Sequence, residues 1–178
     1  MQTKRITRIA LFTAVALLLN LLESLLPPFL PYAPGAKIGL SNLVTLVALV
    51  LLGYTDAYLI LTLRCLLGGI FGGNLAALMY SVPAGVLSLT VQILLFHFAF
   101  RFVSIAGIGF LGAVVHNATQ VAVASVMVRT NLAAMLPFML AASVAAGLAV
   151  GLAAFYLIKF LPRRLFAPYA SASREQTT

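Results

Sequence analysis

Residues 132–161 read LAAMLPFMLAASVAAGLAVGLAAFYLIKFL, a stretch in which Lys159 is the only charged residue. A bilayer core of about 30 Å is crossed by about 20 consecutive apolar residues in a helix, so this stretch is long enough to span a membrane. The rest of the chain is similar, with 63% hydrophobic and 8% charged residues, whereas soluble domains carry about 25% charged residues. Because lipid offers no hydrogen-bond partners, backbone polar groups must pair within helices. We therefore expect an all-α polytopic membrane protein.

The same criterion predicts a single domain of residues 1–167 with six transmembrane helices, at about 6–26, 38–53, 57–72, 76–100, 105–128 and 132–161. The first is too long, and too poor in a small-residue cleavage site, to be a removable signal peptide. A Pro-rich connector follows it at residues 27–35 and cannot be helical. The second helix would be only about 24 Å long, so we expect it to be short or shielded by protein. Residues 54–56 are predicted to connect it to the third, and residues 168–178 to form a disordered tail.

The distribution of Lys and Arg predicts the orientation. With a cytoplasmic N-terminus and six spans, only Lys37 and Arg129 fall outside, Arg64 lies within the third span, and the remaining cations fall inside: Lys4, Arg5, Arg8, Arg101, Lys159, Arg163, Arg164 and Arg174. The positive-inside rule favours this arrangement, with both termini in the cytoplasm. The net charge of +8 then reflects topology and contact with anionic lipid, and we expect no nucleic-acid partner.

Acidic residues are too few for most enzymatic chemistry. The only carboxylate side chains are those of Glu23, Asp56 and Glu175, whereas Mg²⁺-dependent phosphoryl or prenyl transfer requires clustered carboxylates. Cys65 and two histidines do not complete a metal site or a nucleophile triad. We expect no catalytic residue, no metal and no cofactor, and a protein that is not an enzyme by itself. Asp56 is interpreted as a cap at an inner turn.

Polar residues within the apolar spans are the candidate binding residues, because an ionisable group in hydrocarbon usually faces the bundle interior and has a use. They share the midplane and the outer half of the predicted bundle: Glu23, Asn42, Arg64, Asn74, Gln92, His116, Asn117 and Gln120. This distribution predicts a polar pocket that opens to the outside beneath the Pro-rich connector and Lys37.

Structural interpretations of the same residues remain open. Arg64 can pair with Glu23 or with helix-end carbonyls, and His116 with Asn117 can form an interhelical hydrogen-bond clamp. His97, close to the predicted inner surface, is more simply interpreted as interfacial. Ala10 and Ala14, four residues apart in the first span, form a small-residue pattern that lets helices approach closely.

A series of short motifs carries a resemblance to a known group. They are RIALFTAVA at residues 8–16, PGAKIGLSNL at 34–43, LLGY at 51–54, LRCLLGGIFGG at 63–73, YSVPAG at 80–85 and GAVVHNATQ at 112–120. The chain resembles the substrate-binding (S) components of energy-coupling factor (ECF) transporters. More narrowly, it is similar to the bacterial membrane family called heptaprenyl diphosphate synthase component I, also known as the Gx transporter family.

The resemblance implies a six-helix S-component bundle with a ligand site near the outer face. It also implies that Ala10 and Ala14 contact a coupling membrane subunit, whose ATPase pair powers uptake while the S component topples in the membrane. The chain itself has no G-x-x-x-x-G-K-[ST] loop, so these partners would supply the ATP hydrolysis.

Three functions follow as hypotheses. The first is capture of a small, anionic or neutral, vitamin- or precursor-like molecule, in which Arg64 supplies positive charge, His116 can add pH dependence, and neutral hydrogen bonds come from Asn42, Asn74, Gln92, Asn117 and Gln120. The alternative is a non-catalytic membrane accessory subunit of a heptaprenyl diphosphate synthase system in isoprenoid or menaquinone side-chain synthesis, with Arg64 and Lys37 holding a diphosphate. The third is a structural membrane subunit without a ligand.

Overall fold

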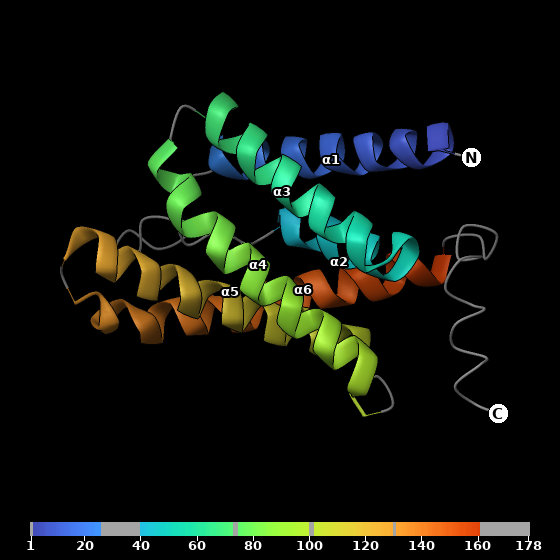
Figure 1. Ribbon diagram of the computed structural model, residues 1–178. Coiled ribbons are helices and arrows are strands. Elements are labelled where there is room, and N and C mark those ends of the chain that lie inside the picture. Colours follow the sequence, from blue (N-terminus) through green and yellow to red (C-terminus); the bar gives the residue numbers. More distant parts are fainter. Residues whose placement is uncertain (1, 26–39, 73–74, 100–101, 130, 161–178) are drawn as a thin grey trace.

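The computed structural model describes residues 2–25, 40–72, 75–99, 102–129 and 131–160, which are helical and include no strand. Figure 1 shows the helices, which are α1 (Gln2–Leu25), α2 (Leu40–Leu52), α3 (Tyr54–Phe71), α4 (Leu75–Phe98), α5 (Ile105–Val128) and α6 (Leu136–Phe160), with a 3-10 turn η1 (Ala133–Met135) before α6. The predicted all-α class is confirmed. Several predicted features lie outside the described residues: the Pro-rich connector with Lys37, Asn74, and the C-terminal tail.

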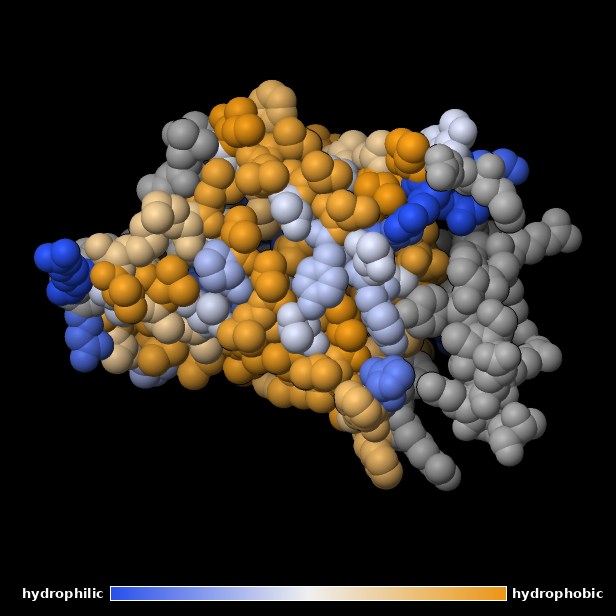
Figure 2. All heavy atoms as spheres, viewed as in Figure 1, coloured by the Kyte–Doolittle hydropathy of each residue, from blue (hydrophilic) through white to orange (hydrophobic). Residues whose placement is uncertain are grey.

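Five of the helices, α1 and α3 to α6, are long and apolar enough to cross a membrane. Large hydrophobic side chains are exposed along them, for example Leu11, Ile70 and Leu152. Figure 2 shows apolar side chains over most of the visible face, with the most hydrophilic residues near its two ends. This is the surface of a multi-pass membrane protein, in which lipid contacts the exposed apolar side chains.

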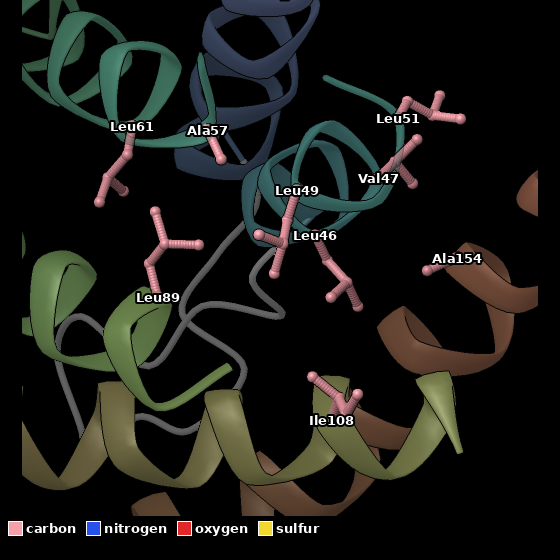
Figure 3. Packing of buried hydrophobic residues seen from close by; sticks show 9 residues of the cluster. All are labelled: Leu46, Val47, Leu49, Leu51, Ala57, Leu61, Leu89, Ile108 and Ala154. Atoms are coloured by element: carbon pink, nitrogen blue, oxygen red, sulfur yellow. The ribbon is translucent and has the colours of Figure 1, made fainter. Parts of the chain in front are cut away.

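The short helix α2 lies at the centre of the bundle and contacts all five other α-helices. Its residues from Val44 to Leu51 are all buried. Figure 3 shows four of its side chains packed among residues from α3 to α6, in a cluster that comprises Leu46, Val47, Leu49, Leu51, Ala57, Leu61, Leu89, Ile108 and Ala154. The expectation that this helix is shielded by protein therefore agrees with the structure.

The first turn of α2 lies inside the bundle and not at its end. Helix α2 has 13 residues. At 1.5 Å per residue it is about 20 Å long, which is about two thirds of the thickness of a bilayer core. Figure 1 shows α2 starting midway along the bundle and running to the end where α1 begins and α6 ends. The chain thus places a helix N-terminus at membrane depth.

Among the helix boundaries that differ from the sequence prediction, two change the connections between helices. The expected connector at residues 54–56 is wrong, because α3 begins at Tyr54 and Gly53 alone separates it from α2. Gly53 has φ 96°, a conformation that glycine adopts without a side-chain clash, so one residue suffices for the reversal. The last helix starts at Leu136 and not at residue 132, after the turn η1.

An ion pair joins the starts of α1 and α3. Arg5 donates to Asp56 Oδ1 from Nε at 2.9 Å and from Nη2 at 2.5 Å. The N-cap of α3 is Gly53, and no side chain caps it, so the interpretation of Asp56 as a cap is wrong. Asp56 is buried, and its carboxylate holds α1 against the turn between α2 and α3.

Helices α5 and α6 pack closely at glycines. A Cβ on Gly109 would lie 2.8 Å from the Cα of Gly151, and a Cβ on Gly151 would lie 2.5 Å from the carbonyl oxygen of Ala106. Such small residues let helix backbones approach in membranes, where packing replaces the hydrophobic effect as a driving force.

We predict that Gly151→Ala destabilises the protein by about 1–3 kcal/mol, because the added methyl group overpacks the α5–α6 interface. The measurement is thermal unfolding of the purified protein in detergent. Ala149→Val is the matched control, since Ala149 is exposed on the same helix and its added methyl groups meet lipid or detergent. An unchanged melting temperature for Gly151→Ala would contradict the close packing.

Candidate ligand-binding site

Arg64 lies in the interior of the bundle, against the first turn of α2. Its side chain is on α3 and only 6% exposed. Nη1 donates to the hydroxyl of Ser41, and Nη2 donates to Asn42 Oδ1 at 2.7 Å. A buried charge is tolerated only when it is paired or hydrogen-bonded; here both hydrogen-bond acceptors are neutral.

The antiparallel α2–α3 hairpin creates this contact. Ser41 precedes Gly53 by nearly as many residues as separate Gly53 from Arg64, so the two side chains lie at the same depth. The first turn of a helix carries N–H groups without intrahelical partners. The guanidinium and these N–H groups therefore concentrate positive potential at one place inside the bundle.

Part of the guanidinium has no partner in the described part of the chain. The Nε atom of Arg64 is fully buried, and its N–H donates to no acceptor among those residues. Since Nε–H is a donor only, it can hydrogen-bond to an acceptor that a bound molecule supplies.

Two further candidate residues lie within electrostatic range of Arg64. Glu23 on α1, only 5% exposed, interacts with the guanidinium through space. His116 on α5 does so too, and its ring lies near the backbone carbonyl of Ala84. Within the described residues, the buried Nδ1 of His116 has no partner that meets hydrogen-bond geometry. Of the predicted site residues, the structure joins Arg64 and Asn42 by a hydrogen bond, while Glu23 and His116 are related to Arg64 by electrostatics alone.

The other predicted residues have different surroundings. Asn117 donates to the Ser143 hydroxyl at 2.6 Å, and Ser143 in turn donates to the carbonyl of Met139 at 2.7 Å, which links α5 to α6. Gln92 is buried against Gly112 of α5, where an added Cβ would lie 2.0 Å from Nε2. Gln120 is half-buried on α5. Lys37 and Asn74 lie outside the described residues.

Sequence reasoning missed Ser41. Ser41 is only 5% exposed and belongs to the same first turn of α2 as Asn42. Its hydroxyl accepts a hydrogen bond from Arg64. The signal was present in the sequence, since Ser41 directly precedes Asn42 at the start of an apolar run. Asn and Arg were singled out because they are costly in a membrane, and a serine hydroxyl is not.

The two alanines expected to contact a partner lie on an open face of α1. Ala10 and Ala14 are both exposed, as are Leu11 and Leu18 beside them. An open depression of about 300 Å³ lies nearby at the start of α1, lined by Thr3, Lys4, Thr7, Arg8 and Leu11. It includes none of the predicted ligand residues.

We predict that Asn42→Leu destabilises the protein by about 1–3 kcal/mol, because it leaves a charged N–H of Arg64 without an acceptor. In the Arg64→Leu background the same substitution should cost much less, since the two residues act as one unit. Thermal unfolding in detergent measures all four proteins of this cycle. Thr62→Val, which removes an exposed hydroxyl of α3, is the control, and additive effects of Asn42→Leu and Arg64→Leu would refute the coupling.

Comparison with known proteins gives one family. The sequence model of heptaprenyl diphosphate synthase component I matches residues 12–157. No curated protein and no solved structure matches the chain. The matched region runs from α1 to α6 and includes every described residue of the Arg64 site. The chain therefore belongs to the heptaprenyl diphosphate synthase component I family.

Proposed function

We propose that this protein is the substrate-binding membrane subunit of an ECF-type uptake transporter in the bacterial cytoplasmic membrane. It captures a small, anionic or neutral, vitamin- or precursor-like molecule from the outer face. The observation that carries this proposal is the Arg64 guanidinium, buried inside the bundle with neutral hydrogen-bond partners and a spare donor at Nε.

Burial of Arg64 costs free energy, which suggests that the residue has a function. A charged side chain at membrane depth costs at least about 2.5–3.5 kcal/mol. Structural stability alone does not call for such a group, because apolar side chains of similar volume fill a core as well or better. An acceptor on a ligand would satisfy Nε–H and offset the cost in the bound state, which supports a binding role.

The exposed face of α1 supports a membrane partner. Ala10 and Ala14 present small side chains four residues apart on a helix whose neighbours in the bundle are α2 and α3. A partner helix can approach such a face closely. We assign this face to the coupling membrane subunit, whose ATPase pair supplies the energy for release inside.

The family name supports a second candidate, a non-catalytic accessory subunit of a prenyl diphosphate synthase system. In that function Arg64 and Lys37 would hold a diphosphate while the apolar helices hold the prenyl chain. The partner would then be a soluble synthase subunit with the aspartate-rich motifs that this chain, with one Asp, does not have.

We predict that the protein purified in mild detergent from its native host carries a stoichiometric small polar metabolite, and that Arg64→Ala reduces its occupancy at least tenfold. A hydrogen bond to a charged group is worth about 1.5–3 kcal/mol, which corresponds to that loss. Native mass spectrometry measures the bound molecule. Lys159→Ala removes an exposed cation of α6 and should retain it.

The outcomes of this experiment separate the candidates. A bound prenyl diphosphate would favour the accessory subunit. A metabolite retained in full by a folded Arg64→Ala protein would show that Arg64 does not bind it.

We predict that Ala10→Leu combined with Ala14→Leu abolishes co-purification of the coupling subunit, because bulky side chains prevent close helix approach. Bound metabolite should be unchanged, since both residues face away from the bundle. The measurement is mass-spectrometric identification of proteins retained by a tagged subunit. Ala122→Leu, on the exposed face of α5, is the control. Retention of the ATPases by the double variant would contradict the assigned surface, and recovery of a soluble synthase subunit would favour the second candidate.

A further inference from the structure

We propose that the start of α1 binds the headgroup phosphate of an anionic phospholipid. The binding surface is the open depression lined by Thr3, Lys4, Thr7, Arg8 and Leu11, which we call the α1 depression. It is separate from the residues around Arg64, and its ligand is independent of the transport function proposed above.

Lys4 and Arg8 are two exposed cations of the α1 depression, and neither forms an ion pair among the described residues. The carboxylate of Asp56 is already held by Arg5. Glu23 lies near the other end of α1, about 22 Å from Arg8 along the helix axis. The described part of the protein therefore does not balance the positive charge of the depression.

The spacing of the two cations favours a bound anion. Lys4 and Arg8 are four residues apart, so they lie on one face of α1, and like charges at this spacing destabilise a helix. An anion between them removes the repulsion. The other described cations are placed differently. Arg5 is ion-paired and Arg64 is buried, while Arg129 and Lys159 lie near the ends of α5 and α6.

The hydrogen-bonding groups of the depression suit a lipid headgroup. The ammonium of Lys4 and the guanidinium of Arg8 can form charge-assisted hydrogen bonds with phosphate oxygens. The Thr7 hydroxyl donates to the carbonyl oxygen of Thr3 at 2.9 Å, so the Thr7 oxygen can still accept. A headgroup hydroxyl, such as those of the glycerol group in phosphatidylglycerol, is a suitable donor to it.

The depression becomes apolar further along α1. Leu11 is 61% exposed and follows Arg8 by about one turn. Val15 is also exposed, one turn beyond Leu11 on the same face. A soluble anion would meet only the cations, whereas a phospholipid also contacts Leu11 and Val15 with an acyl chain. The adjoining basic and apolar parts therefore favour a phospholipid over a free phosphate ion.

The α1 depression lies at one end of the bundle, where headgroups are found. Figure 1 shows α1 beginning at the end where α6 finishes, and Figure 2 shows the most hydrophilic residues of the visible face near its two ends. The distribution of Lys and Arg predicts that this end faces the cytoplasm. Basic side chains near a membrane surface are attracted to its anionic headgroups within about one Debye length.

The test uses the purified full-length protein in nanodiscs that contain equal amounts of phosphatidylglycerol and phosphatidylcholine with the same acyl chains. Native mass spectrometry measures the lipids retained on the protein. We expect wild type to retain phosphatidylglycerol at least fivefold more than phosphatidylcholine. Lys4→Gln combined with Arg8→Gln should reduce this preference at least fivefold, since each basic group near an anionic membrane surface contributes about fivefold in affinity. Lys159→Gln removes an exposed cation at the same end of the bundle and should keep the preference.

Inorganic phosphate distinguishes a lipid from a soluble anion. Isothermal titration of wild type in detergent should show no saturable binding of inorganic phosphate. Saturable binding that the double variant loses would identify a site for a soluble anion and overturn the lipid assignment.

Three results with the lipids would also overturn the proposal: equal retention of both lipids by wild type, an unchanged preference in the double variant, or the same loss in Lys159→Gln. A protein partner that the double variant loses, without any lipid preference in wild type, would identify an acidic protein surface as the occupant instead. Melting temperatures establish that the variants are folded. If the double variant does not fold, Lys4→Gln and Arg8→Gln alone should each reduce the preference by a smaller factor. The proposed transport function fails separately, because its test is a metabolite whose binding depends on Arg64.

Discussion

A helix of 13 residues cannot reach across a bilayer core, so the polar groups at the start of α2 must be satisfied inside the protein. Every other α-helix contacts α2, and this shell keeps lipid away from its first turn. Arg64 reaches that turn from α3 because the single residue Gly53 folds α3 back along α2. The buried guanidinium and the buried helix start thus lie side by side because α2 is short.

The candidate ligand contacts come from several helices of the bundle. Glu23, Ser41, Asn42 and Arg64 belong to α1, α2 and α3, whereas His116 belongs to α5. Arg5 and Asp56 tie α1 to the start of α3, and glycines hold α5 close to α6. A molecule bound between Arg64 and His116 would therefore connect two groups of helices that are each held together by separate contacts. Binding at such a junction can change how the groups sit against each other, and the proposed transport function would use such a change.

The helical class and most of the helices were predictable, because apolar runs of sufficient length leave few alternatives in a membrane. Boundaries set by local backbone geometry were not. Gly53 as a one-residue turn depends on a positive φ, and a Tyr-Thr-Asp sequence after it reads equally well as a loop. Arg64 and Asn42, which the structure joins by a hydrogen bond, were both selected by depth alone. Depth alone did not show that Asn117 and Gln92 contact other helices and not Arg64, because depth does not specify which side of a helix faces which neighbour. The Arg5–Asp56 pair was missed because it joins residues far apart in sequence.

The synthase function suggested by the family name and the described surroundings of Arg64 differ in the amount of negative charge that the site would have to bind. A synthase subunit that holds a prenyl diphosphate must stabilise at least two negative charges, and enzymes do so with Mg²⁺ on clustered carboxylates. Arg64 instead makes its described hydrogen bonds to two neutral acceptors, the Ser41 hydroxyl and Asn42 Oδ1. Since no group of His, Cys, Asp or Glu that could hold a metal ion occurs among the described residues, the accessory-subunit alternative needs Mg²⁺ ligands from a partner, whereas the proposed capture of a ligand with low charge does not.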